Sequence, residues 1–298
     1  MKTLFPDQFE LSTYISGMWR LPLNTTESDM TAFVETCIEL GVTTFDHADI
    51  YGDYGAEAVF GQTLKAHPHL RDQMEIVTKC GIKLLSGKRP DHLVQSYDTS
   101  AAHIRLSVEN SLSNLHTDHI DLLLIHRPDF LMDADEVAET FEDLRKEGKV
   151  KHFGVSNHTV SQFDLLQSRL PFPLATNQLE FSVLHFQPME DGTLDQAQQL
   201  GCPPMIWSPL GGGSLFTAED ERTTRVRNAL AEVGNELDTD NLMQVAFAWL
   251  RKHPSRPVIV LGTYKPDRIR ESVEAEYLNM TRQQWYRIWE ANKGHRVP

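Results

Sequence analysis

The chain has 298 residues, of which 40% are hydrophobic and 23% charged, so it can build a sizeable core and is not globally disordered. Its 28 Lys and Arg residues against 42 Asp and Glu give a formal net charge of −14, which disfavours binding to nucleic-acid phosphates. The three cysteines form no Cys-x-x-Cys pair, no signal-peptide core follows the N-terminus, and no apolar run approaches the ~20 residues of a membrane span. We therefore predict a cytoplasmic protein with no nucleic-acid or membrane partner.

Short apolar segments alternate along the chain with amphipathic segments. The apolar segments are predicted to be strands at residues 14–19, 43–48, 75–79, 120–126, 152–156, 175–179, 205–207 and 257–261. The amphipathic segments are predicted to be helices at residues 29–40, 56–66, 99–115, 134–146, 160–169, 194–200, 241–252 and 266–275. Three of these helices should end at Gly41, Gly148 and Gly201, each just before the next strand. Residues 281–291 are predicted to form a further helix, and residues 219–227 a charged loop or the start of a helix.

Eight strand–helix alternations predict a parallel sheet that closes into a (β/α)8 TIM barrel. The barrel would carry an N-terminal extension and the C-terminal helix. No linker or shift in composition divides the chain, so residues 1–298 are predicted to form a single domain. An open doubly wound sheet is the alternative.

Polar residues follow most of the predicted strands. Asp46 and Tyr51 follow the second strand, Lys79 closes the third and His126 the fourth. In a barrel these strand ends surround one mouth, where the active site is built. Each residue alone is more often part of a structural ion pair or a packed side chain than a catalyst. Four of them on neighbouring strand ends favour a catalytic site.

These four side chains suit proton transfer at a carbonyl group. A tyrosine has a pKa near ~10 and needs help to exchange a proton at neutral pH. A lysine beside the phenol, held by a carboxylate, can provide that help, and a histidine can polarise the carbonyl oxygen. Because no side chain supplies a hydride, carbonyl reduction by this set implies a nicotinamide cofactor.

The same segments resemble the aldo-keto reductase superfamily over nearly the whole chain. The resemblance lies in residues 45–52 with Glu57 and Gly61, and in residues 152–157, 177–178, 207–211 and 265–271, which follow in the family's order. It implies an oxidoreductase that reduces an aldehyde or ketone with NADPH. Tyr51 would be the general acid, Asp46 and Lys79 would tune it, and His126 would orient the carbonyl.

The resemblance also implies which residues hold the nicotinamide end of the cofactor. Ser156, Asn157 and Gln178 would bind the carboxamide, and Trp207 would stack on the ring through its flat indole face. The ribose or the substrate would contact the end of the first strand, at Gly17, Met18 and Trp19.

The phosphate end of the cofactor is assigned by the same resemblance. Ser208, Leu210 and Gly211 would lie along the pyrophosphate, and the terminal cofactor segment includes Glu271. Thr263, Lys265 and Arg268 would bind a 2′-phosphate at the N-terminus of the last barrel helix. The sequence has Gly262 where many members have lysine and Ser272 where many have asparagine, which weakens the preference. NADP(H) is still expected over NAD(H).

Two other functions are compatible with parts of the pattern. A barrel hydrolase could bind a divalent metal through Asp46, His47, Asp49 and His126, but Tyr51 and Lys79 would then have no role, and we predict no metal. Some aldo-keto barrels instead serve as regulatory subunits that bind cofactor with little turnover. The complete set of four residues argues against that role.

The small-molecule carbonyl substrate is not identified by the sequence. Trp19, Tyr54 and Phe130 are candidate substrate contacts in the strand-end loops. Arg20 and Arg127 could bind an acidic substrate or pair with neighbours such as Asp129. The oligomeric state is open.

Overall fold

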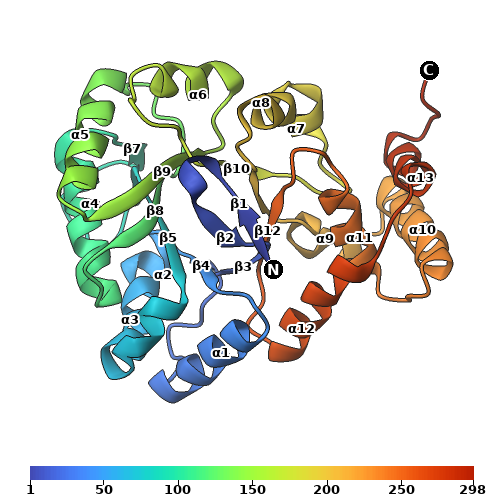
Figure 1. The fold of residues 1–298 in the computed structure, drawn as a ribbon, viewed down its shortest axis with the longest axis horizontal. Coiled ribbons are helices and arrows are strands. Elements are labelled where there is room, and N and C mark those ends of the chain that lie inside the picture. The colour runs from blue at the N-terminus through green and yellow to red at the C-terminus, as the bar shows by residue number, and fades with distance from the viewer.

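Eight parallel strands close into a barrel in the computed structural model, which describes residues 1–298 (Figure 1). The strands are β3 (Tyr14–Gly17), β4 (Thr44–Asp46), β5 (Glu75–Cys80), β8 (Ile120–Ile125), β9 (Val150–Ser156), β10 (Asn177–Glu180), β11 (Met205–Trp207) and β12 (Val258–Leu261). Each pairs with the next, and β12 pairs with β3, where Ile259 faces Tyr14. The predicted (β/α)8 barrel is confirmed, and the open sheet is wrong because this pairing leaves no free edge.

Helices follow the strands and form an outer layer around the barrel (Figure 1). The eight predicted helices correspond to α1 (Glu27–Glu39), α3 (Ala56–Ala66), α4 (Ala101–Leu115), α5 (Ala134–Lys146), α6 (Val160–Gln167), α8 (Thr193–Leu200), α11 (Leu242–Arg251) and α12 (Pro266–Glu274). The short helices α2 (Tyr51–Tyr54), α7 (Gln187–Glu190) and α9 (Ser214–Thr217) lie in strand-to-helix connections, and the predicted C-terminal helix is α13 (Arg282–Lys293). Gly41, Gly148 and Gly201 all have positive φ at helix ends, as the sequence predicted.

One long helix was not predicted at its full length. The segment 219–227, expected to be a charged loop or the start of a helix, leads into α10 (Glu221–Glu236), which packs against α13. Asp220 caps its N-terminus by accepting a hydrogen bond from the backbone N–H of Thr223. Val226, Leu230 and Val233 form a buried stripe of helical spacing, which is sparse among charged neighbours and therefore gives a weak sequence signal.

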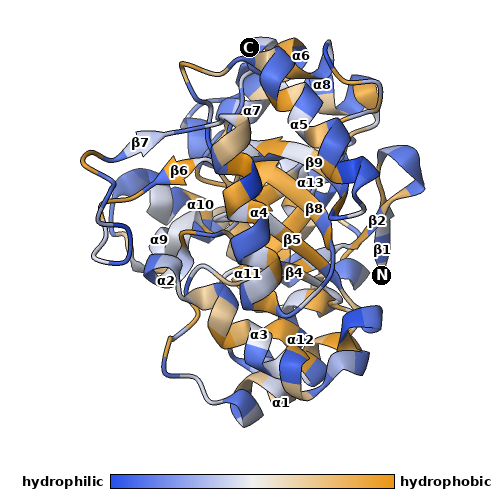
Figure 2. Cartoon of the chain, turned by 90° about the vertical axis from the view of Figure 1, so that its left-hand side faces the viewer, coloured by the Kyte–Doolittle hydropathy of each residue, from blue (hydrophilic) through white to orange (hydrophobic).

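The N-terminal extension closes one end of the barrel. Strands β1 (Lys2–Leu4) and β2 (Glu10–Ser12) form an antiparallel hairpin. Its Phe5, Phe9 and Leu11 are buried in one apolar cluster with residues of the barrel strands. The opposite end of the barrel carries a second small hairpin, β6 (Ile82–Lys83) with β7 (Ser96–Tyr97), so the two hairpins lie on opposite sides in Figure 2.

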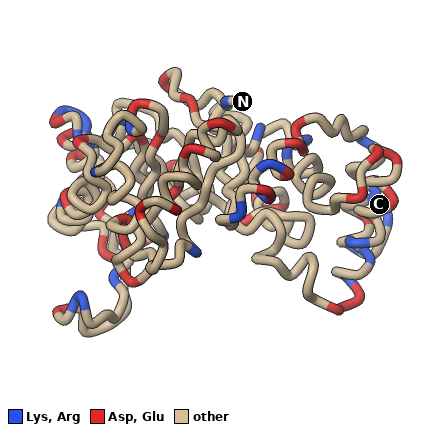
Figure 3. Tube along the Cα trace, turned by 90° about the horizontal axis from the view of Figure 1, so that it is seen from below, with Lys and Arg blue, Asp and Glu red and all other residues tan.

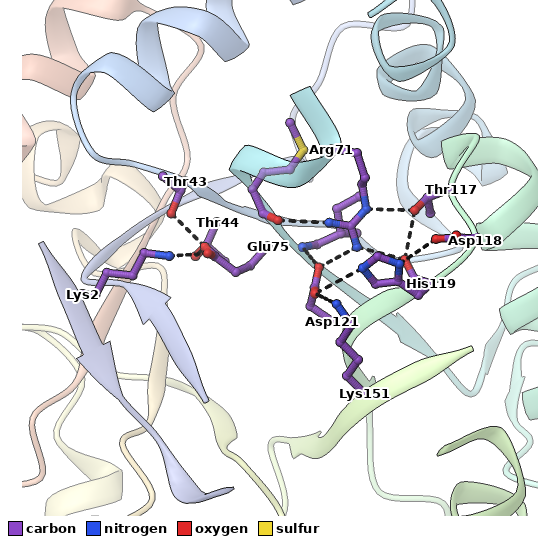
Figure 4. Close-up of polar contacts among 12 residues, drawn as sticks. Lys2, Thr43, Thr44, Arg71, Glu75, Thr117, Asp118, His119, Asp121 and Lys151 are labelled. Atoms are coloured by element: carbon purple, nitrogen blue, oxygen red, sulfur yellow. Dashed lines mark hydrogen bonds and ion pairs between the residues drawn. The ribbon is translucent and has the colours of Figure 1, made fainter. Parts of the chain in front are cut away.

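A polar network joins the strands near the hairpin-closed end (Figure 4). Glu75, the first residue of β5, accepts hydrogen bonds from Thr43 and Thr44 and forms an ion pair with Lys2. Asp121, near the start of β8, is held by Arg71 at 2.7 Å and by Lys151 at 3.2 Å, and it accepts a hydrogen bond from the backbone N–H of Ile76. These contacts fix the N-terminal ends of neighbouring strands, a face of the barrel that serves stability.

Charges of both signs are spread over the outer elements of the molecule (Figure 3). The excess is acidic, since the net charge is −14. None of the helices combines the length and the apolar character that crossing a membrane requires.

Candidate active site

A cavity of about 640 Å³ opens at the carboxyl ends of the barrel strands. Such a volume is typical of a ligand-binding pocket. The parallel barrel brings strand ends far apart in sequence to one mouth. Of the residues proposed from the sequence, the cavity is lined by Gly17, Trp19, Asp46, Tyr51, His126, Ser156, Asn157, Gln178, Trp207, Ser208, Leu210, Thr263, Arg268 and Glu271.

Tyr51 is positioned by a tight turn after β4. Gly52, Asp53 and Tyr54 all have positive φ, between 53° and 60°. A Cβ on Gly52 would meet Leu23 Cδ2 at 2.6 Å, so both the backbone conformation and the space favour glycine there. Tyr51, directly before this turn, lines the cavity.

Lys79 lies behind this wall and joins the polar groups around it. It is fully buried, and its Nζ donates to Asp46 Oδ2 at 2.8 Å, to the His47 carbonyl at 2.6 Å and to the Tyr51 hydroxyl at 3.1 Å. All three donor positions of the ammonium are thus used. Three of the four predicted catalytic residues therefore form one connected group.

Burial and neighbouring charges set the protonation of this group. Burial opposes the charge of Lys79, but Asp46 and Tyr51 outweigh it and raise the lysine pKa. Burial raises the pKa of Tyr51 above its usual value of 10.0, with Lys79 acting in the opposite direction. At neutral pH the site therefore holds a neutral phenol next to an ammonium, which suits proton donation.

His126 completes the set as a neutral imidazole. Burial, together with the charges of Lys79 and Arg127, holds its pKa well below the usual 6.5. Its ring meets the Tyr51 ring edge-on, with centroids 5.8 Å apart. Because it lines the cavity close to the phenol, it can polarise an oxygen atom that the phenol also contacts.

The residues expected at the nicotinamide carboxamide contact one another. Trp207 Nε1 donates to Asn157 Oδ1 at 3.0 Å, and Asn157 Nδ2 donates to Ser156 Oγ at 2.7 Å. Gln178 Nε2 donates to Asp46 Oδ1 at 2.9 Å, so this amide also holds the Asp46 carboxylate in place. The sequence did not predict that contact, which joins residues from opposite sides of the barrel.

The other end of the cavity lies at the loop after β11 and at α12. Gly212 and Gly213 line the cavity there, whereas Gly211 does not. Arg268 and Glu271 line it from α12, and the Glu271 carboxylate accepts a hydrogen bond from Asn241 Nδ2 at 3.4 Å.

Six of the proposed residues lie outside the cavity lining. Lys79 lies behind Tyr51, Met18 is fully buried in the core, and Lys265 is exposed at the N-terminal boundary of α12. Tyr54 accepts a hydrogen bond from the backbone N–H of Leu84, and Phe130 is 87% exposed, and neither of these two candidate substrate contacts lines the cavity. Gly211 is not part of the lining, although Gly212 and Gly213 of the same loop are.

Several lining residues were not proposed from the sequence. They include Phe216 of α9, Asn241 at the N-cap of α11 and Met243 in the first turn of α11. No motif marks these side chains, because α10 separates α11 from the end of β11 in the sequence. Arg20 and Arg127, which the sequence left open, both line the cavity.

The geometry gives no support to the metal-hydrolase alternative. No group of three or more His, Cys, Asp or Glu side chains is arranged to hold a metal ion. His47 is fully buried, against Phe60. Asp49 accepts a hydrogen bond from Ser107, and burial with the nearby charge of Glu57 raises its pKa to about 8. Neither of them lines the cavity that Asp46 and His126 share.

Comparisons with known proteins agree with this arrangement. Residues 15–293 match the Aldo/keto reductase family. Over 297 residues the chain is 53% identical to Oxidoreductase YdhF of Escherichia coli, a match that covers 99% of this chain and 98% of the relative. It is 46% identical over 293 residues to 6-dehydroglucose reductase of Agrobacterium fabrum, with 98% and 97% covered.

A solved structure shows the same fold. A thermostable aldo-keto reductase in complex with the inhibitor epalrestat matches with a TM-score of 0.81 and 22% identity, over 98% of this chain and 99% of the other. The resemblance stated from the sequence is confirmed by these matches. The chain belongs to the aldo/keto reductase family of oxidoreductases.

Proposed function

We propose that this protein reduces an aldehyde or ketone to an alcohol with NADP(H), and that Tyr51 donates the proton. The observation that carries the proposal is the hydrogen bond between Lys79 Nζ and the Tyr51 hydroxyl at the wall of the cavity. A neutral phenol that touches an ammonium can release its proton to a forming alkoxide, because the resulting phenolate is stabilised by the adjacent charge.

The surrounding residues orient the reacting carbonyl. His126 is neutral and lines the cavity beside Tyr51, so it can donate a hydrogen bond to the carbonyl oxygen. Asp46 holds Lys79 and is itself held by Gln178, which keeps the ammonium aimed at the phenol. A carbonyl oxygen placed between the phenol and the imidazole would be polarised by both.

The cavity has room and donors for a dinucleotide. NADP(H) would supply the hydride, which no side chain can provide. Ser156, Asn157, Gln178 and Trp207 would hold the nicotinamide end, along with Gly17 and Trp19. Toward the other end, Ser208, Leu210 and neighbouring backbone would follow the pyrophosphate, and Thr263, Arg268 and Glu271 would hold the adenosine. Lys265 and Gly211 are at most peripheral to this set.

We also propose the class of substrate, the cellular compartment and the boundaries of the functional domain. A small-molecule carbonyl compound is the expected partner, and sugar aldehydes belong in a substrate panel because relatives are named 6-dehydroglucose reductases. The three free, buried cysteines suit the reducing cytoplasm, where we place the reaction. We treat residues 1–298 as one functional barrel unit.

A cofactor titration tests the proposal. NADPH or NADH is added while tryptophan emission is followed, since Trp207 lines the cavity and should be quenched. We expect NADPH to bind more tightly, and Arg268→Met to weaken NADPH roughly 10-fold to 100-fold with little effect on NADH, because a charge-assisted bond to the 2′-phosphate is lost. Arg270→Met is the matched control, an exposed arginine on the same helix outside the cavity lining.

Each outcome of the titration tests a different part of the proposal. Equal affinities for the two cofactors would contradict the 2′-phosphate site but not the reductase. No binding of either would contradict the reductase. Tight NADPH binding without turnover of any carbonyl in the panel would favour the regulatory-subunit alternative.

A further inference from the structure

Arg127 is a cation in the cavity without a partner. It directly follows His126 at the end of β8 and lines the cavity, half-buried. Its guanidinium carbon lies 5.6 Å from the centroid of the Trp207 ring. It forms no ion pair within 4.0 Å, and it makes no side-chain hydrogen bond, although an arginine has five donors.

The nearest candidate partner in the sequence is engaged elsewhere. Asp129 accepts hydrogen bonds from the backbone N–H and the hydroxyl of Thr99, at 3.1 and 2.9 Å, and from the backbone N–H of Leu131 at 2.9 Å. The idea that Arg127 pairs with this neighbour is therefore not supported. Nothing in the loop neutralises the guanidinium.

The remaining charges of the cavity do not neutralise it either. Asp46 is paired with Lys79, and Glu271 lies on α12 with Asn241. His126 is neutral, as argued above. The reactive end of the cavity thus has one uncompensated positive charge, in a chain whose net charge is −14.

We propose that Arg127 is a substrate-specificity residue that binds a carboxylate, so that the preferred substrates are carbonyl compounds that carry a carboxylate group. The inference rests on the proposed reductase function. A guanidinium binds a carboxylate through two parallel hydrogen bonds, and such a pair gains strength in a partly enclosed cavity. Its position next to His126 places the anion beside the reacting carbonyl. The cation–π contact with the Trp207 ring limits the freedom of the guanidinium and holds it at the cavity wall.

Arg20 is the natural comparison within the same cavity. It is exposed, its guanidinium carbon lies 5.1 Å from the Trp19 ring centroid, and its Nη2 donates to the Gly212 carbonyl at 3.3 Å. It reaches toward the loop assigned to the cofactor pyrophosphate rather than toward His126. Removing its charge changes the general field of the cavity without removing the proposed carboxylate contact.

The test compares two aldehydes of similar shape, 4-carboxybenzaldehyde and 4-methylbenzaldehyde, with NADPH as the reductant. We expect the unmodified enzyme to prefer the carboxylate. Arg127→Met should lower kcat/KM for the carboxylate roughly 10-fold to 100-fold, mainly through KM, while kcat/KM for the methyl compound changes little. Arg127→Lys should restore part of the preference, since it keeps the charge but loses the planar fork.

Two controls make the result specific. Arg20→Met should leave the ratio between the two aldehydes nearly unchanged, and the affinity of Arg127→Met for NADPH should match that of the unmodified enzyme. Equal use of both aldehydes by the unmodified enzyme would overturn the inference alone. So would a loss of NADPH affinity in Arg127→Met with equal loss for both aldehydes. Absence of turnover of any carbonyl would overturn the proposed function and the inference with it.

Discussion

Asp46 and His47 are neighbours in the chain but lie in opposite surroundings. Asp46 lines the cavity, whereas the His47 ring packs edge-on against Phe60 of α3, with centroids 4.6 Å apart. Burial and the charge of Lys79 lower the pKa of His47 to about 3, so it stays neutral in the folded protein. The alternation of side chains along a strand therefore decides which polar residue can act at the barrel mouth.

The protonation of Tyr51 predicts the pH dependence of reduction. The proposed reduction needs the protonated phenol, and burial keeps its pKa above 10.0. His126 stays neutral because its pKa is well below 6.5. We expect kcat/KM to be flat between about pH 7 and about pH 9 and to fall only above that range.

Asp46→Asn should shift this profile. The negative charge of Asp46 raises the pKa of Tyr51, so its removal lowers that pKa and moves the alkaline decline toward neutral pH. A pH series of steady-state reduction rates measures the shift. Asp53→Asn, an exposed acid in the turn after Tyr51, is the control and should leave the profile in place. An unshifted profile in Asp46→Asn would contradict Tyr51 as the titrating acid.

For single residues, the sequence predicts which side chains lie at the site better than it predicts which side chains they contact. Tyr51, Lys79, Asp46 and His126 could be proposed from their positions at strand ends. The bond between Gln178 and Asp46 spans 132 residues and depends on the closed barrel, so no local pattern indicates it. The direction of Phe130 depends on the path of its loop, which the sequence alone does not fix.

At the scale of elements, the two ends of the barrel strands have different roles. The carboxyl ends carry the cavity, and the opposite ends carry the network around Asp121 and Arg71 (Figure 4). The Asp121 carboxylate is largely buried, which alone would raise its pKa, but hydrogen bonding with His119 and the charge of Arg71 hold the pKa well below the usual 3.8. The ionised carboxylate therefore stabilises the fold.

Asp121→Asn should lower the free energy of unfolding by roughly 3 kcal/mol near neutral pH, because it leaves Arg71 buried without its counter-charge. The folded-state pKa is depressed, so this contribution is present above the unfolded pKa of ~3.9 and is lost as the pH falls below it. Urea unfolding at about pH 7 and about pH 3 should show a large difference from the unmodified protein that narrows in acid. Asp72→Asn, an exposed acid two residues before Met74, should change stability little at either pH. A difference that persists in acid would contradict this account.

Some helices and strands have stronger sequence patterns than others. Strands and helices around the barrel were predicted because apolar periodicity and helix-ending glycines agree. Helix α10 was missed beyond its start because only a narrow stripe of it is buried. Its stability comes from packing against α13, a contact between segments far apart in the chain.

At the scale of the whole molecule, the closed barrel explains why separate motifs act together. Pairing of β12 with β3 brings the last barrel strand beside the first barrel strand, so Gly17 and Gly262 share one cavity with Tyr51. The N-terminal hairpin closes the far end of the barrel with Phe5, Phe9 and Leu11, which leaves the cavity as the accessible mouth. The eight barrel strands and their closure could be predicted from the sequence, whereas the two small hairpins and the full cavity lining could be observed only in three dimensions.

The most direct test of the account is a single-turnover reaction with NADPH that carries deuterium at both hydrogen positions of nicotinamide C4. The product alcohol should contain one deuterium at the former carbonyl carbon. Tyr51→Phe should form this product at least ~100-fold more slowly, because the proton donor is lost, while its affinity for NADPH is unchanged. An alcohol without deuterium, or equally fast transfer in Tyr51→Phe, would contradict the proposed reduction and the role of Tyr51.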